Sequence, residues 1–332
     1  MLRVEFTHQE LARLRLAPDV DPLWETALSL HLLQRRQAPL AFGSWRREAI
    51  AALRRTGLVA ATRTLMRLCP DRSYFPDFLT PGRGDSDLDT ALERVLSTPR
   101  SRLRAELARL YAPTGRPVPA TLRPLADGCP RALGRLGSAL RAYHRVAVEP
   151  YLGAMRAQAA ADRTARAEAV LTHGAEGLLI VHGELPGWRY RERELRAPYP
   201  IERGLALRGR TLTLVPAFFC VRSPIALADE ELPPVLVHPL SPAPGWLERR
   251  HLGGDAPAAQ LIGASRAELL RILDRPMTTM DLAAALRLAP STASRHATVL
   301  REAGLLLSQR QGVRVLHHRT RLGRAVLEGA LR

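Results

Sequence analysis

The sequence predicts an α+β fold that is mostly helical: an N-terminal helical domain with a small antiparallel sheet, followed by a C-terminal winged helix-turn-helix. Apolar residues recur at helical spacing over residues 22–173, and the alternation typical of strands begins after Gly174. Near the C-terminus, two helical segments are joined by a tight turn and followed by two alternating segments that can pair as a hairpin.

The helices expected in the N-terminal domain each present one apolar face. They are expected over 22–33, over a segment carrying Leu103, Leu107 and Leu110, over 127–149 and over 150–173. Thr98 can cap the second of these helices and Pro99 can open it, while Gly174 can end the last.

The strands of this domain are expected mainly after Gly174. Arg189, Arg191 and Arg193 alternate with other side chains, which predicts one strand over 188–194 with a solvated arginine face. A turn at Arg208-Gly209 can join two further strands as a hairpin. The further strands are expected over 204–208, 210–215, 235–238 and 2–6, the last of which would tie the N-terminus to the middle of the chain.

A linker is indicated between Pro239 and Pro257, where the sequence becomes Ser-Pro-Ala-Pro-Gly and then Gly-Gly-Asp-Ala-Pro. We therefore expect an N-terminal domain over 1–240, a linker over 241–258 and a C-terminal domain over 259–332.

The charge balance favours a polyanionic partner. All 49 basic residues among the 332 are arginine, against 32 acidic residues, which leaves a net charge of +17. The absence of lysine is typical of a GC-rich genome, but the surplus charge still attracts phosphates, because binding them releases condensed counterions. Nucleic acid is favoured over an anionic membrane, since no basic amphipathic helix or lipidation signal accompanies the charge.

The cysteines and the apolar segments indicate a cytoplasmic protein without membrane segments. Cys69, Cys129 and Cys220 form no Cys-x-x-Cys pair, so reduced thiols are expected rather than a zinc site or a disulfide framework. The first ten residues have no signal-peptide core, and the longest apolar stretch, 212–221, is interrupted by Pro216 and too short to span a bilayer.

The C-terminal domain is expected to consist of helices followed by a wing. Thr279 is the expected cap of the second helix, over 280–286. A tight turn over 287–289 leads to Pro290 at the start of the third helix, which Gly304 ends. The helices are expected over 265–273, 280–286, 290–303 and 322–331, and the strands of the wing over 305–310 and 313–319, about Gln311-Gly312.

The third helix has two different faces. At about 100° per residue, Ala293, Ala297 and Leu300 fall on one side and suit a core, while polar and basic residues fall on the other. Short hydroxyl side chains can donate to phosphates or base edges, and Arg295 is long enough for a bidentate contact with a guanine or, alternatively, for a phosphate contact. The residues expected to contact DNA are Thr279, Ser291, Thr292, Ser294, Arg295, His296, Thr298 and Arg301, together with Arg310, Gln311 and Arg314 of the wing.

The run LLRILDRPMTTMDLAAALRLAPSTASRHATVLREAGLLLSQRQGVRVLHHRTRLGRAVL resembles the winged helix of the ArsR/SmtB-type regulators over about residues 261–331. Its most specific part is STASRHATVLREAGLL. The resemblance implies a homodimer, built partly through the first and last helices of the domain, that inserts two recognition helices into successive major grooves of a double-stranded operator. In the N-terminal domain, LWETALSLHLLQ, SYFPDFLTP and GRTLTLVPAFFC are similar to parts of longer actinobacterial regulators of this family.

The sequence departs from the family's pattern at several positions. Arg287 stands where glycine is usual, and Ala289 where a serine commonly caps the recognition helix, a loss of about 1 kcal/mol. The metal-ligand patterns of the family's sensors are missing, so neither a metal nor another cofactor is expected. His317 and His318 are adjacent in a strand and cannot chelate one ion together, and we expect them to be exposed or to face DNA.

These observations predict a dimeric, non-enzymatic, DNA-binding transcriptional repressor whose N-terminal domain senses an unknown small-molecule effector or reinforces dimerisation. The alternative is an enzyme or small-molecule-binding protein with a fused DNA-binding domain. His173, His182 and Glu184 are its strongest candidate catalytic group, but no P-loop, G-x-S-x-G, H-E-x-x-H or G-x-G-x-x-G motif accompanies them. A non-specific architectural DNA binder would account for the charge but not for the additional fold of the N-terminal domain.

Overall fold

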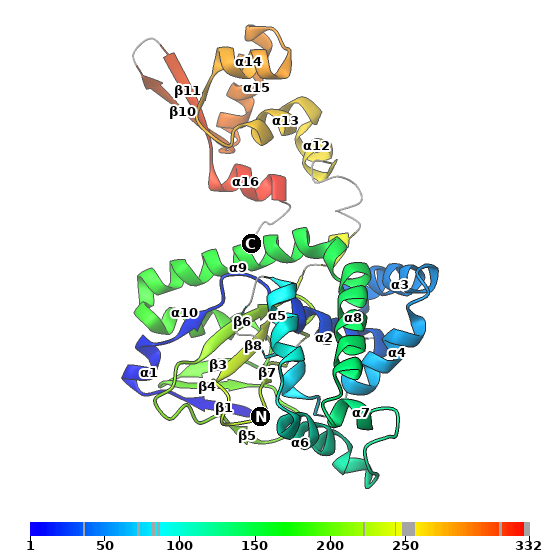
Figure 1. The fold of residues 1–332 in the computed structure, drawn as a ribbon. Helices are drawn as coiled ribbons and strands as arrows, with labels where there is room; N and C mark the ends of the chain where they lie inside the picture. The colour runs from blue at the N-terminus through cyan, green and yellow to red at the C-terminus, as the bar shows by residue number, and fades with distance from the viewer. Residues whose placement is uncertain are drawn as a thin grey trace. The chain divides into compact units, whose positions relative to one another are not determined.

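The computed structural model describes residues 1–35, 37–71, 74–81, 84, 87–221, 223–242, 244–247, 256–311 and 314–328. The chain divides into two compact units, Met1–Pro244 and Gly245–Arg332 (Figure 1). The boundary falls inside the segment 241–258 expected as a linker, of which residues 243 and 248–255 lie outside the described part. Over the described ranges, no helix has the length and the apolar run needed to cross a bilayer.

The first unit is built around α2 (Pro22–Gln34), which is buried along most of its length. Asp21 caps this helix, because its Oδ1 accepts hydrogen bonds from the backbone N–H groups of Leu23 and Trp24 at 2.9 and 3.1 Å. The other helices of the unit are α1 (His8–Ala12), α3 (Pro39–Arg55), α4 (Val59–Leu68), α5 (Leu88–Leu96), α6 (Arg100–Tyr111), α7 (Arg123–Ala126), α8 (Pro130–Ala147), α9 (Leu152–His173) and α10 (Gly177–Ile180).

Two expected helix boundaries were wrong. Thr98 does not cap α6, because its hydroxyl donates to the carbonyl of Arg94 in the preceding helix and Pro99 occupies the cap position. Residues 127–149 do not form one helix, because Gly128 has a φ of 69° and the α8 helix begins only at Pro130.

The expectation of a single small antiparallel sheet was also wrong, since the unit contains two four-stranded mixed sheets. Their strand orders are β3-β4-β1-β5 and β2-β6-β8-β7, with parallel pairing of β1 with β5 and of β6 with both β2 and β8. Every residue of β6 and β8 is buried, as is typical of strands covered on both faces. The strands are β1 (Leu2–Glu5), β2 (Arg15–Leu16), β3 (Arg189–Arg191), β4 (Glu194–Ala197), β5 (Arg203–Gly204), β6 (Thr213–Ala217), β7 (Ile225–Ala226) and β8 (Val235–Pro239).

Two features that the sequence predicts after Gly174, one strand and one hairpin, form differently. Residues 188–194 were expected as one strand, but Glu192 and Arg193 have φ values of 52° and 64°, and this two-residue turn folds β3 back on β4. The turn at Arg208-Gly209 does form, but it joins no hairpin because β5 and β6 lie in different sheets. β1 pairs with β4, as expected for an N-terminal strand tied to the middle of the chain.

A buried cluster of an arginine, an aspartate and two histidine rings connects α9 to the second sheet. Arg166 of α9 is paired with Asp162 at 2.7 and 2.9 Å and also donates to the carbonyl of Leu178. Its guanidinium lies 3.4 Å from ring nitrogens of both His182 and His238. Burial and the neighbouring Arg166 charge lower the pKa of both histidines well below the usual value, so both rings are neutral at pH 7.

The second unit contains α12 (Ala256–Ile262), α13 (Ala264–Ile272), β9 (Met277–Thr278), α14 (Thr279–Leu286), α15 (Pro290–Glu302), β10 (Leu306–Gln311), β11 (Arg314–Arg319) and α16 (Arg321–Glu328). Leucines and small residues of α13, α14, α15 and β10 form its core. The sequence did not predict α12, nor β9, which makes the sheet three-stranded in the order β10-β11-β9. Residues 329–332, which include the expected end of the last helix, lie outside the described part. The expected α+β, mostly helical fold with a C-terminal helix-turn-helix is confirmed.

We predict that His144→Gln weakens the dependence of stability on pH. His144 is buried, its Nδ1 lies 3.0 Å from the hydroxyl of Thr26, and burial lowers its pKa to about 4. An unfolded histidine titrates near pH 6.5, so between about pH 6.5 and 4 the unfolded chain binds the extra proton and stability is lost as the pH falls, by up to ~1.4 kcal/mol per pH unit.

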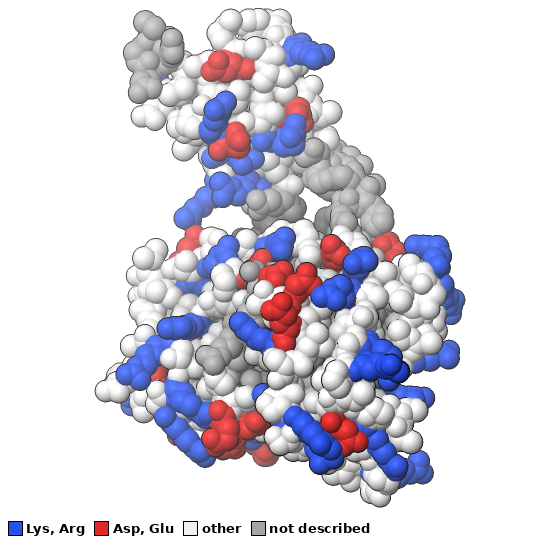
Figure 2. Space-filling model, in the orientation of Figure 1, with Lys and Arg blue, Asp and Glu red and all other residues white. Residues whose placement is uncertain are grey.

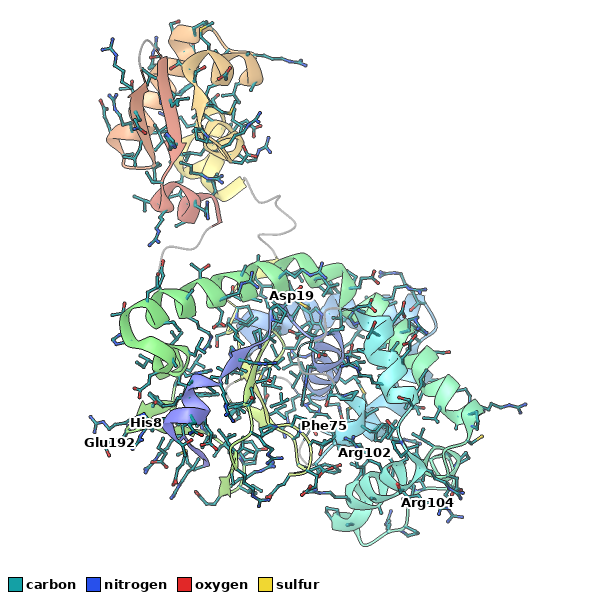
Figure 3. The ribbon with its side chains drawn as sticks, turned by 60° about the vertical axis from the view of Figure 1, so that its left-hand side comes forward. His8, Asp19, Phe75, Arg102, Arg104 and Glu192 are labelled. Atoms are coloured by element: carbon teal, nitrogen blue, oxygen red, sulfur yellow. The ribbon has the colours of Figure 1, made fainter. Side chains whose placement is uncertain are left out.

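Urea unfolding of the full-length protein at several pH values between 5 and 7.5 measures this slope. The slope should be smaller in His144→Gln than in the wild type. The exposed His8, labelled in Figure 3, gives the control His8→Gln, which should keep the wild-type slope. Identical slopes in all three proteins would contradict the prediction.

Candidate nucleic-acid interface

One face of α15 is anchored in the core of the second unit. Ala293, Ala297 and Leu300 are each at most 1% exposed, as their spacing predicted. Pro290 opens the helix, and Gly304, with a φ of 71°, follows its last turn. Ala289 occupies the N-cap position without a side-chain hydrogen bond, so the helix lacks the serine cap that the resemblance would supply.

The opposite face of α15 carries polar and basic side chains to the surface. Ser291, Ser294, Arg295 and Arg301 are exposed, whereas Thr292, His296 and Thr298 are half-buried. Hydroxyl and guanidinium groups can both donate hydrogen bonds to phosphates and to base edges. Four of the seven residues expected from α15 are therefore exposed, and three are partly covered.

Arg287 closes the turn between α14 and α15. It caps α14 with φ 53° and ψ 42°, the left-handed conformation that glycine adopts most easily. The backbone N–H of Leu288 then donates to the carbonyl of Ala283 at 2.9 Å, which holds the turn tight. The chain thus keeps the short turn of a helix-turn-helix at a cost of roughly 1–2 kcal/mol for a non-glycine residue.

The expected cap at Thr279 was wrong by one residue. Thr278 caps α14, because its hydroxyl and the carboxylate of Asp281 bond reciprocally to each other's backbone N–H groups. Thr279 is the first residue of the helix, and its hydroxyl lies 2.9 Å from Nε2 of His317.

The expectation that His317 is exposed or faces DNA was also wrong. It is 5% exposed, and its Nδ1 lies 2.9 Å from the hydroxyl of Ser308 on β10. The cause is β9, which pairs with the other side of β11 and makes β11 the central strand of its sheet. The His317 ring therefore joins the start of α14 to the wing, and burial lowers its pKa.

The wing is a regular antiparallel hairpin. β10 and β11 pair from Leu306 opposite Arg319 to Gln311 opposite Arg314. Arg310 is exposed near the end of β10. The turn residues 312–313 and the side chains of Gln311 and Arg314 lie outside the described part, so the expected contacts of Gln311 and Arg314 stay predictions.

The second unit is the more basic of the two for its length. Residues 245–332 contain 14 arginines and seven acidic residues, a net charge of +7, against +10 for the much longer segment 1–244. Figure 2 shows arginine side chains on several parts of its surface. A charge of this density favours a polyanionic ligand.

The two histidines of the candidate catalytic group, His173 and His182, lie in different surroundings. His182 is fully buried beside Arg166, and its ring stacks on Trp188 with centroids 4.7 Å apart. His173 is exposed at the end of α9, and the side chain of Glu184 is not described. Among the described residues, no three histidine, cysteine, aspartate or glutamate side chains are grouped so that they could hold a metal ion.

Comparison with known proteins agrees with the geometry of the second unit. Residues 265–308 match the family model described as bacterial regulatory protein, arsR family. Comparisons with curated proteins and with solved structures returned no match. The match covers α13, the helix-turn-helix and the first residues of the wing, and a domain of this kind indicates DNA binding and transcriptional regulation. The chain therefore carries an ArsR-family helix-turn-helix domain at residues 265–308, close to its C-terminus and after a long N-terminal region.

Proposed function

We propose that the protein is a cytoplasmic, homodimeric transcriptional repressor that reads a double-stranded operator through α15. The observation that carries the proposal is the division of α15 into a buried alanine and leucine face and an exposed face with Ser294 and Arg295 at its centre. The proposed contacts are those of Ser291, Thr292, Ser294, Arg295, His296, Thr298 and Arg301 on α15, of Thr279 at the start of α14, and of Arg310, Gln311 and Arg314 on the wing.

We assign the Met1–Pro244 unit to effector sensing or to dimerisation, without an enzymatic activity. The burial of His182 against Arg166 and Trp188 supports this assignment, because a ring enclosed on those sides offers no access to a substrate. An enzyme with a fused DNA-binding domain remains the alternative.

We predict that the purified protein is a dimer. A single winged helix with short hydroxyl side chains at its centre buries too little DNA surface for tight specific binding, and an operator with two-fold symmetry requires two copies. Light scattering coupled to size-exclusion chromatography, at micromolar concentration with and without DNA, measures the mass. A mass of one 36.6 kDa chain under both conditions would be incompatible with the prediction.

Metal ions should not control DNA binding. The ligand patterns of the family's metal sensors are missing from the sequence, and the three cysteines lie far apart along it. Operator affinity, measured by fluorescence anisotropy, is expected to change less than tenfold on addition of zinc, cadmium or arsenite. Metal-dependent release of the operator would show that a site exists, and alanine variants of Cys69, Cys129 and Cys220 would then locate it.

Substitution of two arginines should distinguish a contact that reads a base from a contact with a phosphate. Arg295→Ala should cost roughly 1–3 kcal/mol on the operator and much less on random DNA, because a base-reading side chain discriminates between the two. Arg310→Ala should weaken binding to both DNAs alike and lower the slope of log affinity against log salt by about one, because a wing residue meets phosphates.

Salt titrations of both variants on both DNAs distinguish the two roles. Arg135→Ala is the matched control, since Arg135 is an exposed arginine of α8 in the other unit. Equal losses on operator and random DNA would assign Arg295 to a phosphate, and wild-type binding by both variants would refute the proposed interface.

A further inference from the structure

The segment 39–68, which forms α3 and α4, is one of the most basic parts of the first unit. Residues 39–68 contain six arginines and one acidic residue, Glu48, a net charge of +5. Residues 39–68 make up about one eighth of the segment 1–244, whose net charge is +10. Other basic segments, such as α8 with four arginines, also contribute to this total and are partly offset by acidic segments elsewhere. What distinguishes α3 and α4 is the placement of their arginines on the outer face of each helix.

The arginines of α3 point away from the core. The buried face of this helix is formed by Phe42, Trp45, Ala49 and Leu53. Arg47 and Arg54 fall on the opposite side at helical spacing, and both are exposed, as is Arg55.

The arginines of α4 are arranged in the same way. Its buried residues are Thr62, Leu65 and Leu68, and the exposed Arg63 and Arg67 lie on the opposite side, one helical turn apart. Figure 2 shows the resulting group of arginine side chains over α3 and α4, at the right-hand edge of the Met1–Pro244 unit.

Within the described part of the chain, no carboxylate lies within ion-pair distance of Arg54, Arg55, Arg63 or Arg67. The single acidic residue of 39–68, Glu48, is half-buried and accepts a hydrogen bond from the hydroxyl of Tyr151 at 3.1 Å. Like charges one turn apart on a helix repel each other, so Arg63 and Arg67 destabilise α4 slightly. A polyanion laid across the face would relieve this repulsion.

We propose that the basic face formed by Arg47, Arg54, Arg55, Arg63 and Arg67 is a second DNA-binding surface, which contacts phosphates of the duplex beside the operator without reading its sequence. The choice of DNA as the polyanion rests on the proposed function. Because both units belong to one chain, binding of α15 to an operator raises the effective concentration of DNA near the first unit, so individually weak contacts are sufficient.

The experiment compares a short duplex that holds only the operator with one extended by flanking DNA on both sides. The full-length variant R54Q/R55Q/R63Q/R67Q removes four charges from the basic face. The matched control R131Q/R135Q/R189Q/R191Q removes four exposed arginines from α8 and β3, and circular dichroism checks that both variants fold like the wild type.

Wild type and control should bind the extended duplex at least tenfold more tightly than the short one at low salt. The basic-face variant should lose most of that gain, and its slope of log affinity against log salt on the extended duplex should fall by about 2 to 4, since each phosphate contact contributes about 0.9. All three proteins should bind the short duplex with similar affinity.

Two results would overturn the proposal: no gain from the flanks in the wild type, or equal losses in the two variants, which would reveal only a net-charge effect. Binding to phosphatidylserine vesicles that depends on the basic face, without any flank effect, would identify a membrane surface instead. In each case the wild type would still prefer the operator to random DNA. Loss of that preference would refute the proposed function itself.

Discussion

The burial of three small or apolar side chains, Ala293, Ala297 and Leu300, determines what the second unit presents to its surroundings. Because an α-helix turns by about 100° per residue, burying this face leaves Ser294 and Arg295 no position but the surface. Alanines at two of the three positions let α15 lie close to its neighbours in the core. The direction in which the outer face of α15 points is therefore fixed by the packing of its inner face.

Local signals in the sequence were sufficient to predict α15. They failed where the structure depends on residues that are distant in the sequence. Pro290 and Gly304 mark the ends of α15, and the periodicity between them assigns its faces. The strand β9 has only two residues and no periodicity of its own, yet it decides that His317 is buried. Thr279 was expected to cap α14, whereas the spacing of three residues from Thr278 to Asp281 is the local signal that marks Thr278 as the cap.

The first unit was harder to predict for the same reason, because its polar residues join segments far apart in sequence. Glu25 accepts the backbone N–H groups of Phe218 and Phe219 at 2.6 and 3.0 Å and so attaches α2 to the end of β6. Burial raises the pKa of Glu25 to about 8. Burying this carboxyl group is costly unless hydrogen bonds satisfy its oxygens. Neither such contacts nor the parallel strand pairings have a signal in local composition.

The central claim is that two copies of α15 lie in successive major grooves of one operator. Once an operator has been selected from genomic DNA, interference by methylation at guanine N7, which lies in the major groove, tests it most directly. The account predicts two groups of interfering guanines whose centres are about 10–10.5 base pairs, or a multiple of that, apart. A single group, or interference confined to minor-groove methylation at adenine N3, would contradict it.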